Sequence, residues 1–151
     1  GESPQITVET PPPSPESCPA LQLPFFPDGP GYHHAVELRA IDGTWGDENP
    51  ITTWFRMRQP LLDDTPTRPL ERVMFAADAT SGIAACLPFD GFTFVNTDLS
   101  VHVGRPPTGE WIALRAATVV GANGVACAHA TILDSLGQVG VVGETLVVRK
   151  R

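Results

Sequence analysis

The sequence has few basic side chains. Its 151 residues include ten lysines and arginines against 17 acids, which gives a formal net charge of -7. A protein that binds nucleic-acid phosphates needs a basic face, and so few scattered cations do not supply one. The three cysteines, Cys18, Cys86 and Cys127, lie far apart and lack the close pairing of metal ligands or redox dithiols. We therefore expect reduced thiols and no nucleic-acid partner.

Long apolar runs are also missing. The one run of 18 residues without Asp, Glu, Lys or Arg, residues 116–133, is interrupted by the polar Asn123 and His129, and no basic segment followed by an apolar run stands at the start. This pattern predicts neither a membrane span nor a secretory signal, and it favours a cytoplasmic location. The glycines stand singly at turns, so neither of the common glycine-rich phosphate loops is matched. Because the sequence starts inside a polar, proline-rich segment, we expect it to be a fragment of a longer protein or a processed chain.

Proline, in contrast, is abundant. The chain has 16 prolines, and Pro11, Pro12 and Pro13 run together in the first 30 residues. Such a segment forms neither a helix nor a central strand, so residues 1–30 are predicted to be a linker or extended arm. It ends in four large apolar residues, which we expect to dock on a surface, and a turn: Leu21, Leu23, Phe25, Phe26 and Pro27–Pro30. Residues 31–151 are of a suitable length for a single domain.

Hydrophobic spacing divides this domain into strands and one helix. Residues 33–41 and 51–58 are rich in strand-forming residues, and the first run stops at the turn Asp42-Gly43. Between Arg68 and Ala85 the spacing changes to steps of three and four, which predicts a helix that begins near Pro69. The positions at this spacing are Leu70, Val73, Met74, Ala77 and Ser81. Because this segment is also rich in alanine, we expect the helix to be buried.

The rest of the chain is predicted to be β-structure. Strands are expected at about 92–103, 110–121, 125–133 and 139–149, with a hairpin turn at Asn123-Gly124 and a longer one at 134–138. Two strands, one helix and then a meander of long strands is an α+β order. A sheet of this kind must curl around the helix to bury it.

Asp78 is the first candidate for chemistry, because it lies in the helix that we expect to be buried. An ionised carboxylate there is costly unless it is hydrogen-bonded, paired or facing a cavity. The residues around it are small, Thr80 among them, and leave room for a ligand or water. A helix-end residue bonded to neighbouring amides explains Asp78 as well as a catalytic role does.

Glu144 is the second candidate. It shares its alternation with Val142, Leu146 and Val148, which places an acid on an apolar strand face. A β-bulge near Gly143, or an edge position that turns the side chain to solvent, is the favoured explanation for a single strand glutamate. A functional acid is the alternative.

Two further residues, in and just after the third predicted strand, are weaker candidates for a functional role. His102 is favoured as a surface or interface histidine, because no nucleophile or acid stands at a recognised motif spacing from it. Arg105 lies between Gly104 and Pro106 and could bind a phosphate or carboxylate bidentately. A structural salt bridge accounts for Arg105 equally well.

Three segments together resemble the C-terminal half of acyl-CoA thioesterases of the thioesterase II (TesB-like) family. These segments are Ala77-Asp78-Ala79, the run from Asn96 to Pro106 with Glu110-Trp111 after it, and the final run from Glu144 to Arg149. The resemblance spans residues 33–151. It implies a hotdog fold, in which an antiparallel sheet wraps around one central helix.

The resemblance also implies thioester hydrolysis by a water molecule held by three side chains. In the family these are a helix aspartate, a hydroxyl residue and a strand glutamine, which fall here on Asp78, on Asn96 or the adjacent Thr97, and on Glu144. Asn96 and Glu144 depart from the family pattern. Two buried acids would share a proton, with one ionised as base and one protonated as donor. Thr80, Thr97 and Arg105 are candidates for substrate contacts, with Arg105 facing the CoA phosphates.

Three functions follow as hypotheses. The first is an acyl-CoA thioesterase that needs no cofactor and pairs with a second hotdog, either an N-terminal half or a homodimer mate, to cover its sheet edge. The second is a non-catalytic acyl-binding or assembly half, favoured by the two departures. The third and weakest is a hotdog hydratase that uses Asp98 and His102, which stand four residues apart on one strand.

Overall fold

The computed structural model describes residues 10–24, 29–46 and 50–151. Its strands are β1 (Val36–Asp42), β2 (Ile51–Met57), β3 (Phe92–Val103), β4 (Trp111–Val120), β5 (Val125–Asp134) and β6 (Gly137–Lys150). Its helices are the 3-10 turn η1 (Pro15–Ser17) and the α-helices α1 (Tyr32–Ala35), α2 (Pro69–Ala77) and α3 (Thr80–Ile83). None of the helices described is long and apolar enough to cross a membrane.

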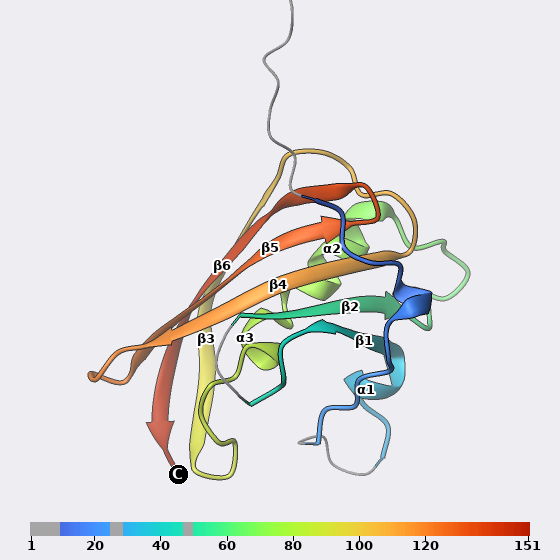
Figure 1. Ribbon diagram of the computed structural model, residues 1–151. Coiled ribbons are helices and arrows are strands. Elements are labelled where there is room, and N and C mark those ends of the chain that lie inside the picture. The colour runs from blue at the N-terminus through green and yellow to red at the C-terminus, as the bar shows by residue number, and fades with distance from the viewer. Residues whose placement is uncertain (1–9, 25–28, 47–49) are drawn as a thin grey trace, which may run out of the picture.

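The six strands form one antiparallel sheet in the order β1-β2-β4-β5-β6-β3. β1 and β3 are therefore its edges, and the 12-residue β3 pairs on one side only, with β6. α2 and α3 lie together on one face of the twisted sheet, as Figure 1 shows. The sheet thus has a helix-covered face and an outer face.

The predicted strands match this sheet closely. β3 to β6 lie within a few residues of their predicted ranges, and Gly124 and Gly137 take the positive φ angles, 78° and 111°, that their hairpins require. The first predicted strand starts too early. Residues 33–35 belong to the short helix α1, where His34 N–H donates to Gly31 O at 3.0 Å, and β1 begins only at Val36.

The central helix is packed on one face only. Val73, Ala76 and Ala77 are fully buried, and with Ile112 and Leu114 of β4 they form part of the main core. Alanine lets the sheet approach the helix closely. Leu70 and Met74 were expected on the buried face, but they are 53% and 47% exposed. The prediction of a wholly buried helix was wrong, because α2 presents a second apolar stripe to the outside.

Residues 10–24 lie against the sheet. Ala20 forms a bridge with Arg39 of β1, and Leu21 and Leu23 pack against the main core. On the outer face, Trp54 Nε1 donates to Pro13 O at 3.0 Å, and Cys18 is buried beside Trp54. The first half of the expected docking segment therefore contacts this domain. Phe25, Phe26 and residues 27–28, where the expected turn begins, lie outside the described residues. The boundary between arm and domain at residue 30 stays a prediction.

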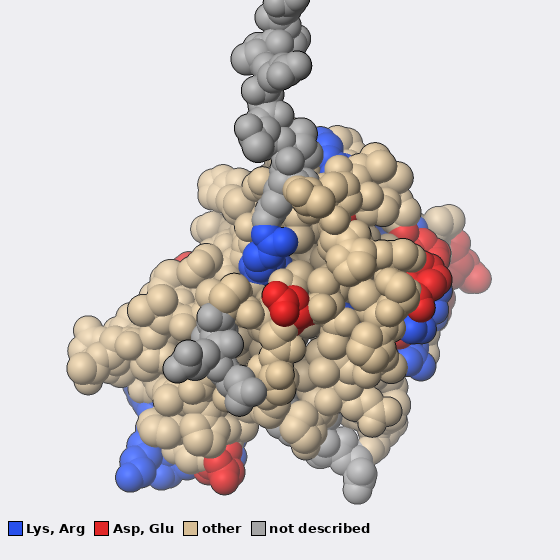
Figure 2. Space-filling view, in the orientation of Figure 1, with Lys and Arg blue, Asp and Glu red and all other residues tan. Residues whose placement is uncertain are grey.

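Charged side chains are distributed in small groups. Figure 2 shows basic and acidic side chains close to one another, separated by wide uncharged areas, on the face seen in Figure 1. On the outer face of β1 and β2, Glu37 accepts hydrogen bonds from Arg39 and Arg56. The visible face therefore has no continuous basic surface of the kind that nucleic acids need.

An ion pair between the partly exposed Arg105 and a buried carboxylate fixes the turn region after β3. Asp134 is fully buried and accepts hydrogen bonds from both terminal nitrogens of Arg105, at 2.7 and 2.6 Å, and from the backbone N–H groups of Thr108 and Leu136. Burial by itself would raise the pKa of Asp134, but these hydrogen bonds outweigh it and lower the pKa. One side chain therefore joins the loop after β3 to the β5–β6 hairpin.

We predict that Arg105→Gln or Asp134→Asn lowers the free energy of unfolding by about 3–5 kcal/mol, because each leaves the other partner without its counter-charge. Arg68→Gln is the control, since Arg68 and Glu71 form an exposed pair worth about 1 kcal/mol or less. Denaturant unfolding at neutral pH measures all three. Losses as small as that of Arg68→Gln would contradict a structural role for Arg105.

Candidate active site

The helical segment predicted for residues 68–85 is interrupted at Asp78. α2 ends there with Asp78 as its C-cap, and α3 starts after Ala79. The turn tightens at this point, because Ala79 N–H donates to Ala76 O, only three residues back, at 3.0 Å. A break of this kind leaves backbone groups near it without helical partners.

Side chains satisfy two of these backbone groups. The Thr80 hydroxyl donates to Ala77 O at 2.7 Å, and the Ser81 backbone N–H donates to Glu144 Oε2 at 3.2 Å. The second bond joins α3 to β6, across 63 residues of sequence. Thr80 is fully buried, so its hydroxyl serves the fold and does not contact a substrate in this arrangement.

Glu144 is one of the most buried polar residues of the described chain, at 1% exposure. The explanation favoured from sequence, a bulge or a solvent-facing edge, is wrong, because Glu144 projects into the core face of β6 between Val142 and Leu146. No described residue bonds its second oxygen, Oε1. Burial raises the pKa of Glu144, the Ser81 hydrogen bonds oppose the rise, and the charges of Asp78 and Asp98 add to it.

Asp78 differs from the expectation for a buried helix residue, because its side chain is exposed at the end of α2. It lies near Glu144, whose pKa it raises, and near Tyr32, whose pKa is raised first by burial and then by the same negative charge. The exposed carboxylate of Asp78 and the buried carboxylate of Glu144 therefore both lie near the helix break.

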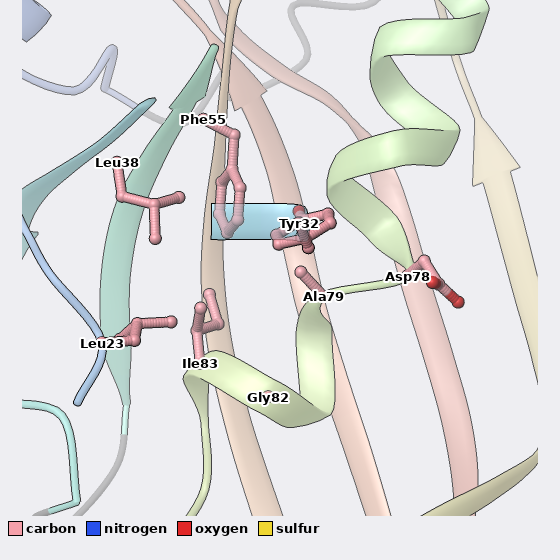
Figure 3. Close-up of a pocket in the computed structure, with 8 residues that line it drawn as sticks. All are labelled: Leu23, Tyr32, Leu38, Phe55, Asp78, Ala79, Gly82 and Ile83. Atoms are coloured by element: carbon pink, nitrogen blue, oxygen red, sulfur yellow. The ribbon is translucent and has the colours of Figure 1, made fainter. Parts of the chain in front are cut away.

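Two hollows meet at Asp78. One is an apolar pocket of about 300 Å³, lined by Leu23, Tyr32, Leu38, Phe55, Asp78, Ala79, Gly82 and Ile83. In Figure 3, Asp78 lies at one side of this pocket, and Leu23 and Leu38 lie at the other. The second hollow, of about 600 Å³, runs beside α2 and also has Asp78 in its wall. Asp78 thus borders both the apolar pocket and the open groove, and in Figure 3 its carboxylate points away from the other residues that line the pocket.

The other predicted water-holding residues lie on the edge strand β3. Asn96 is opposite Leu146 in the ladder and therefore faces the same side of the sheet, where it is exposed. The ladder is irregular at the next residue: Thr97 is the extra residue of a bulge, and its hydroxyl lies 3.2 Å from both Thr145 O and the Asp98 carboxylate. The register uncertainty between Asn96 and Thr97 arises from this bulge.

The remaining candidates lie elsewhere. Arg105 was a candidate for CoA phosphates, but its guanidinium forms the salt bridge with Asp134, so the structural alternative applies. His102 is exposed on β3, as expected for a surface histidine. Among the described residues, no group of His, Cys, Asp and Glu side chains is arranged to hold a metal ion.

Sequence reasoning missed three contributors to this site. Tyr32 reaches the pocket from α1, whose residues 33–35 were predicted as strand, the Ser81 N–H is a backbone group, and Asp98 was considered only with His102. The proximity of Asp98 to Glu144 could have been found from the sequence by pairing the predicted strands β3 and β6, because this pairing places Asp98 opposite Thr145, the neighbour of Glu144. Tyr32 has none that we can identify.

Comparison with known proteins gives a consistent picture. A family model for the acyl-CoA thioesterase C-terminal domain matches residues 15–148. No curated protein sequence matches the chain significantly.

Solved structures with the same fold include two long relatives and one short one. Acyl-CoA thioesterase II TesB2 from Mycobacterium marinum is 19% identical with a TM-score of 0.60, over 88% of this chain and 56% of its own. The tesB protein of Mycobacterium avium subsp. paratuberculosis is 17% identical with a TM-score of 0.61, over 85% and 55%. A thioesterase from Haemophilus influenzae is 17% identical with a TM-score of 0.54, over 75% and 78%. This chain therefore spans about half the length of the first two.

The burial of Glu144 predicts a pH-dependent stability. In the unfolded chain Glu144 ionises near its ordinary pKa of 4.5, whereas the folded protein keeps the proton to higher pH. The contribution of the protonated Glu144 to the free energy of unfolding is complete below pH 4.5, and it is lost as the pH rises through the pKa of the folded protein. We therefore expect Glu144→Gln to unfold at a higher denaturant concentration than the parent at pH 8, with the difference shrinking towards pH 4.

Glu71→Gln is the matched control for this experiment. Glu71 is partly exposed, and hydrogen bonds from the backbone and side chain of Arg68 lower its pKa, so its contribution to stability changes with pH in the opposite direction. A parent protein whose stability relative to Glu144→Gln does not change between pH 4 and pH 8 would contradict the burial of a protonated glutamate.

Proposed function

The chain belongs to the family of acyl-CoA thioesterase C-terminal domains, and on this premise we propose that it hydrolyses acyl-CoA thioesters at the helix break around Asp78. The predicted family and the predicted hotdog fold are both confirmed. The mechanism, the site residues and the partner belong to the proposal.

Asp78 is the proposed general base, and its position carries the argument. It is an exposed carboxylate at the junction of an apolar pocket, suited to an acyl chain, and an open groove, suited to the rest of the substrate. Asp78 accepts a proton from water as the water oxygen attacks the thioester carbonyl carbon. The carbon–sulfur bond then breaks, the sulfur takes a proton, and the free acid and CoA leave.

Glu144 acts in this proposal through the helix break. It is too buried to reach a substrate in the described arrangement, and its raised pKa favours the neutral form. A neutral Glu144 accepts the Ser81 hydrogen bond as a glutamine side chain would. The departure from the family glutamine is therefore compatible with activity.

Asn96 is the proposed second ligand of the attacking water. Its amide donates and accepts hydrogen bonds, as a hydroxyl does, and it lies on the helix side of β3. The adjacent Thr97 is engaged with Thr145 and Asp98 within the bulge, which makes Asn96 the better candidate.

A second hotdog is the proposed partner. β3 exposes the outer edge of its 12 residues, and Leu61, Leu70 and Met74 are each about half exposed beside α2. An unpaired strand edge and an apolar surface both favour a protein partner. The same features support the alternative function, a non-catalytic acyl-binding or assembly half, if the departures at Asn96 and Glu144 remove activity.

The function is tested by hydrolysis of short, medium and long acyl-CoAs by the full-length protein. We predict that Asp78→Asn lowers kcat by at least about 100-fold, because it removes the base, whereas Glu144→Gln keeps activity near that of the parent. Asp90→Asn, an exposed aspartate in the turn before β3, is the matched control and should have no effect. No turnover of any substrate by the parent would favour the acyl-binding alternative.

A further inference from the structure

The groove beside α2 is elongated. Leu70, Met74 and Asp78 lie four residues apart on one face of the helix, and all three line the groove together with Arg68. From Arg68 to Asp78 the helix rises by about 15 Å at its usual 1.5 Å per residue. The groove therefore has Asp78 at one end, apolar side chains along its middle, and Arg68, which is paired with Glu71, at the other end.

A separate polar hollow lies at the basic end. It measures about 300 Å³ and is lined by Met57, Arg58, Gln59, Pro60, Pro66, Thr67, Arg72 and Glu110. Thr67 immediately precedes Arg68, and Arg72 is on the first turns of α2, so this hollow is next to the groove's end. Arg72 Nη1 donates to Gly109 O at 3.0 Å, which holds the side chain in place.

Arg58 and Arg72 lack the ion pairs that four other arginines of the described residues form. Arg39 and Arg56 pair with Glu37, Arg68 pairs with Glu71, and Arg105 pairs with Asp134. Within the described residues, neither Arg58 nor Arg72 forms an ion pair, although Glu110 lines the same hollow. Two guanidinium groups without counter-ions, in one polar hollow of an acidic protein, suit an anionic ligand.

We propose that Arg58 and Arg72 bind the phosphate groups of CoA. This inference rests on the proposed function. CoA carries its phosphates at one end and its thiol at the other, joined by the uncharged pantetheine arm. With the arm along Leu70 and Met74, the thioester lies at Asp78 and the acyl chain enters the apolar pocket.

The test compares two substrates of the full-length protein with the same acyl group: the acyl-CoA and the acyl-N-acetylcysteamine thioester, which lacks the nucleotide. We expect Arg58→Gln and Arg72→Gln each to raise KM for the acyl-CoA by about tenfold, the usual effect of losing a hydrogen bond to a charged group. KM for the short thioester should stay within about twofold of the parent value. Arg72→Lys keeps the charge and should recover part of the binding, and Arg149→Gln, at the end of β6, is the control.

A change of KM that is equal for both substrates, or absent for both, would overturn the proposal. If the parent hydrolyses neither substrate, the proposed function fails, and calorimetric titration with adenosine 3′,5′-bisphosphate tests the binding site by itself. Binding to the parent that is lost in Arg58→Gln and Arg72→Gln, but kept in Arg149→Gln, would support the site. Absence of binding to the parent, or equal binding to all variants, would refute it.

Discussion

The geometry of the site depends on one hydrogen bond, from the Ser81 N–H to the buried carboxyl group of Glu144. The helix break at Asp78 leaves this N–H without a partner inside the helix, and Glu144 of β6 supplies the acceptor. Without the break, the chain would continue as one helix and Asp78 would lie at an internal position. With it, the end of α2 turns Asp78 outward, to the point where the apolar pocket and the groove meet.

The two buried acids of the described residues have pKa values shifted in opposite directions. Asp134 receives four hydrogen bonds, two of them from Arg105, and its pKa is lowered, so it is an ionised structural anchor. Glu144 receives a backbone hydrogen bond, has two acids near it, and its pKa is raised. In the proposed mechanism, the raised pKa of Glu144 favours its neutral form, which limits its repulsion with the proposed base Asp78.

Local patterns predicted most of the fold. The alternation in β3 to β6 and the turn Asn123-Gly124 are local signals, and the structure follows them. The helix break was not predicted, because alanine favours an uninterrupted helix and the competing hydrogen bonds come from Thr80 and from distant Glu144. The same limit applies to Arg105, whose role is decided by Asp134, 29 residues away. Asp78 was identified from sequence as a candidate, but its exposure follows from the break.

The most direct test of this account is a carboxyl ¹³C NMR titration of Glu144 in the parent and in Asp78→Asn. The account predicts that Glu144 titrates above 4.5 in the parent, and at a lower pH in Asp78→Asn, because the variant lacks the negative charge of Asp78. A Glu144 that titrates at or below 4.5, or that does not respond to Asp78→Asn, would contradict a neutral buried acid coupled to the proposed base.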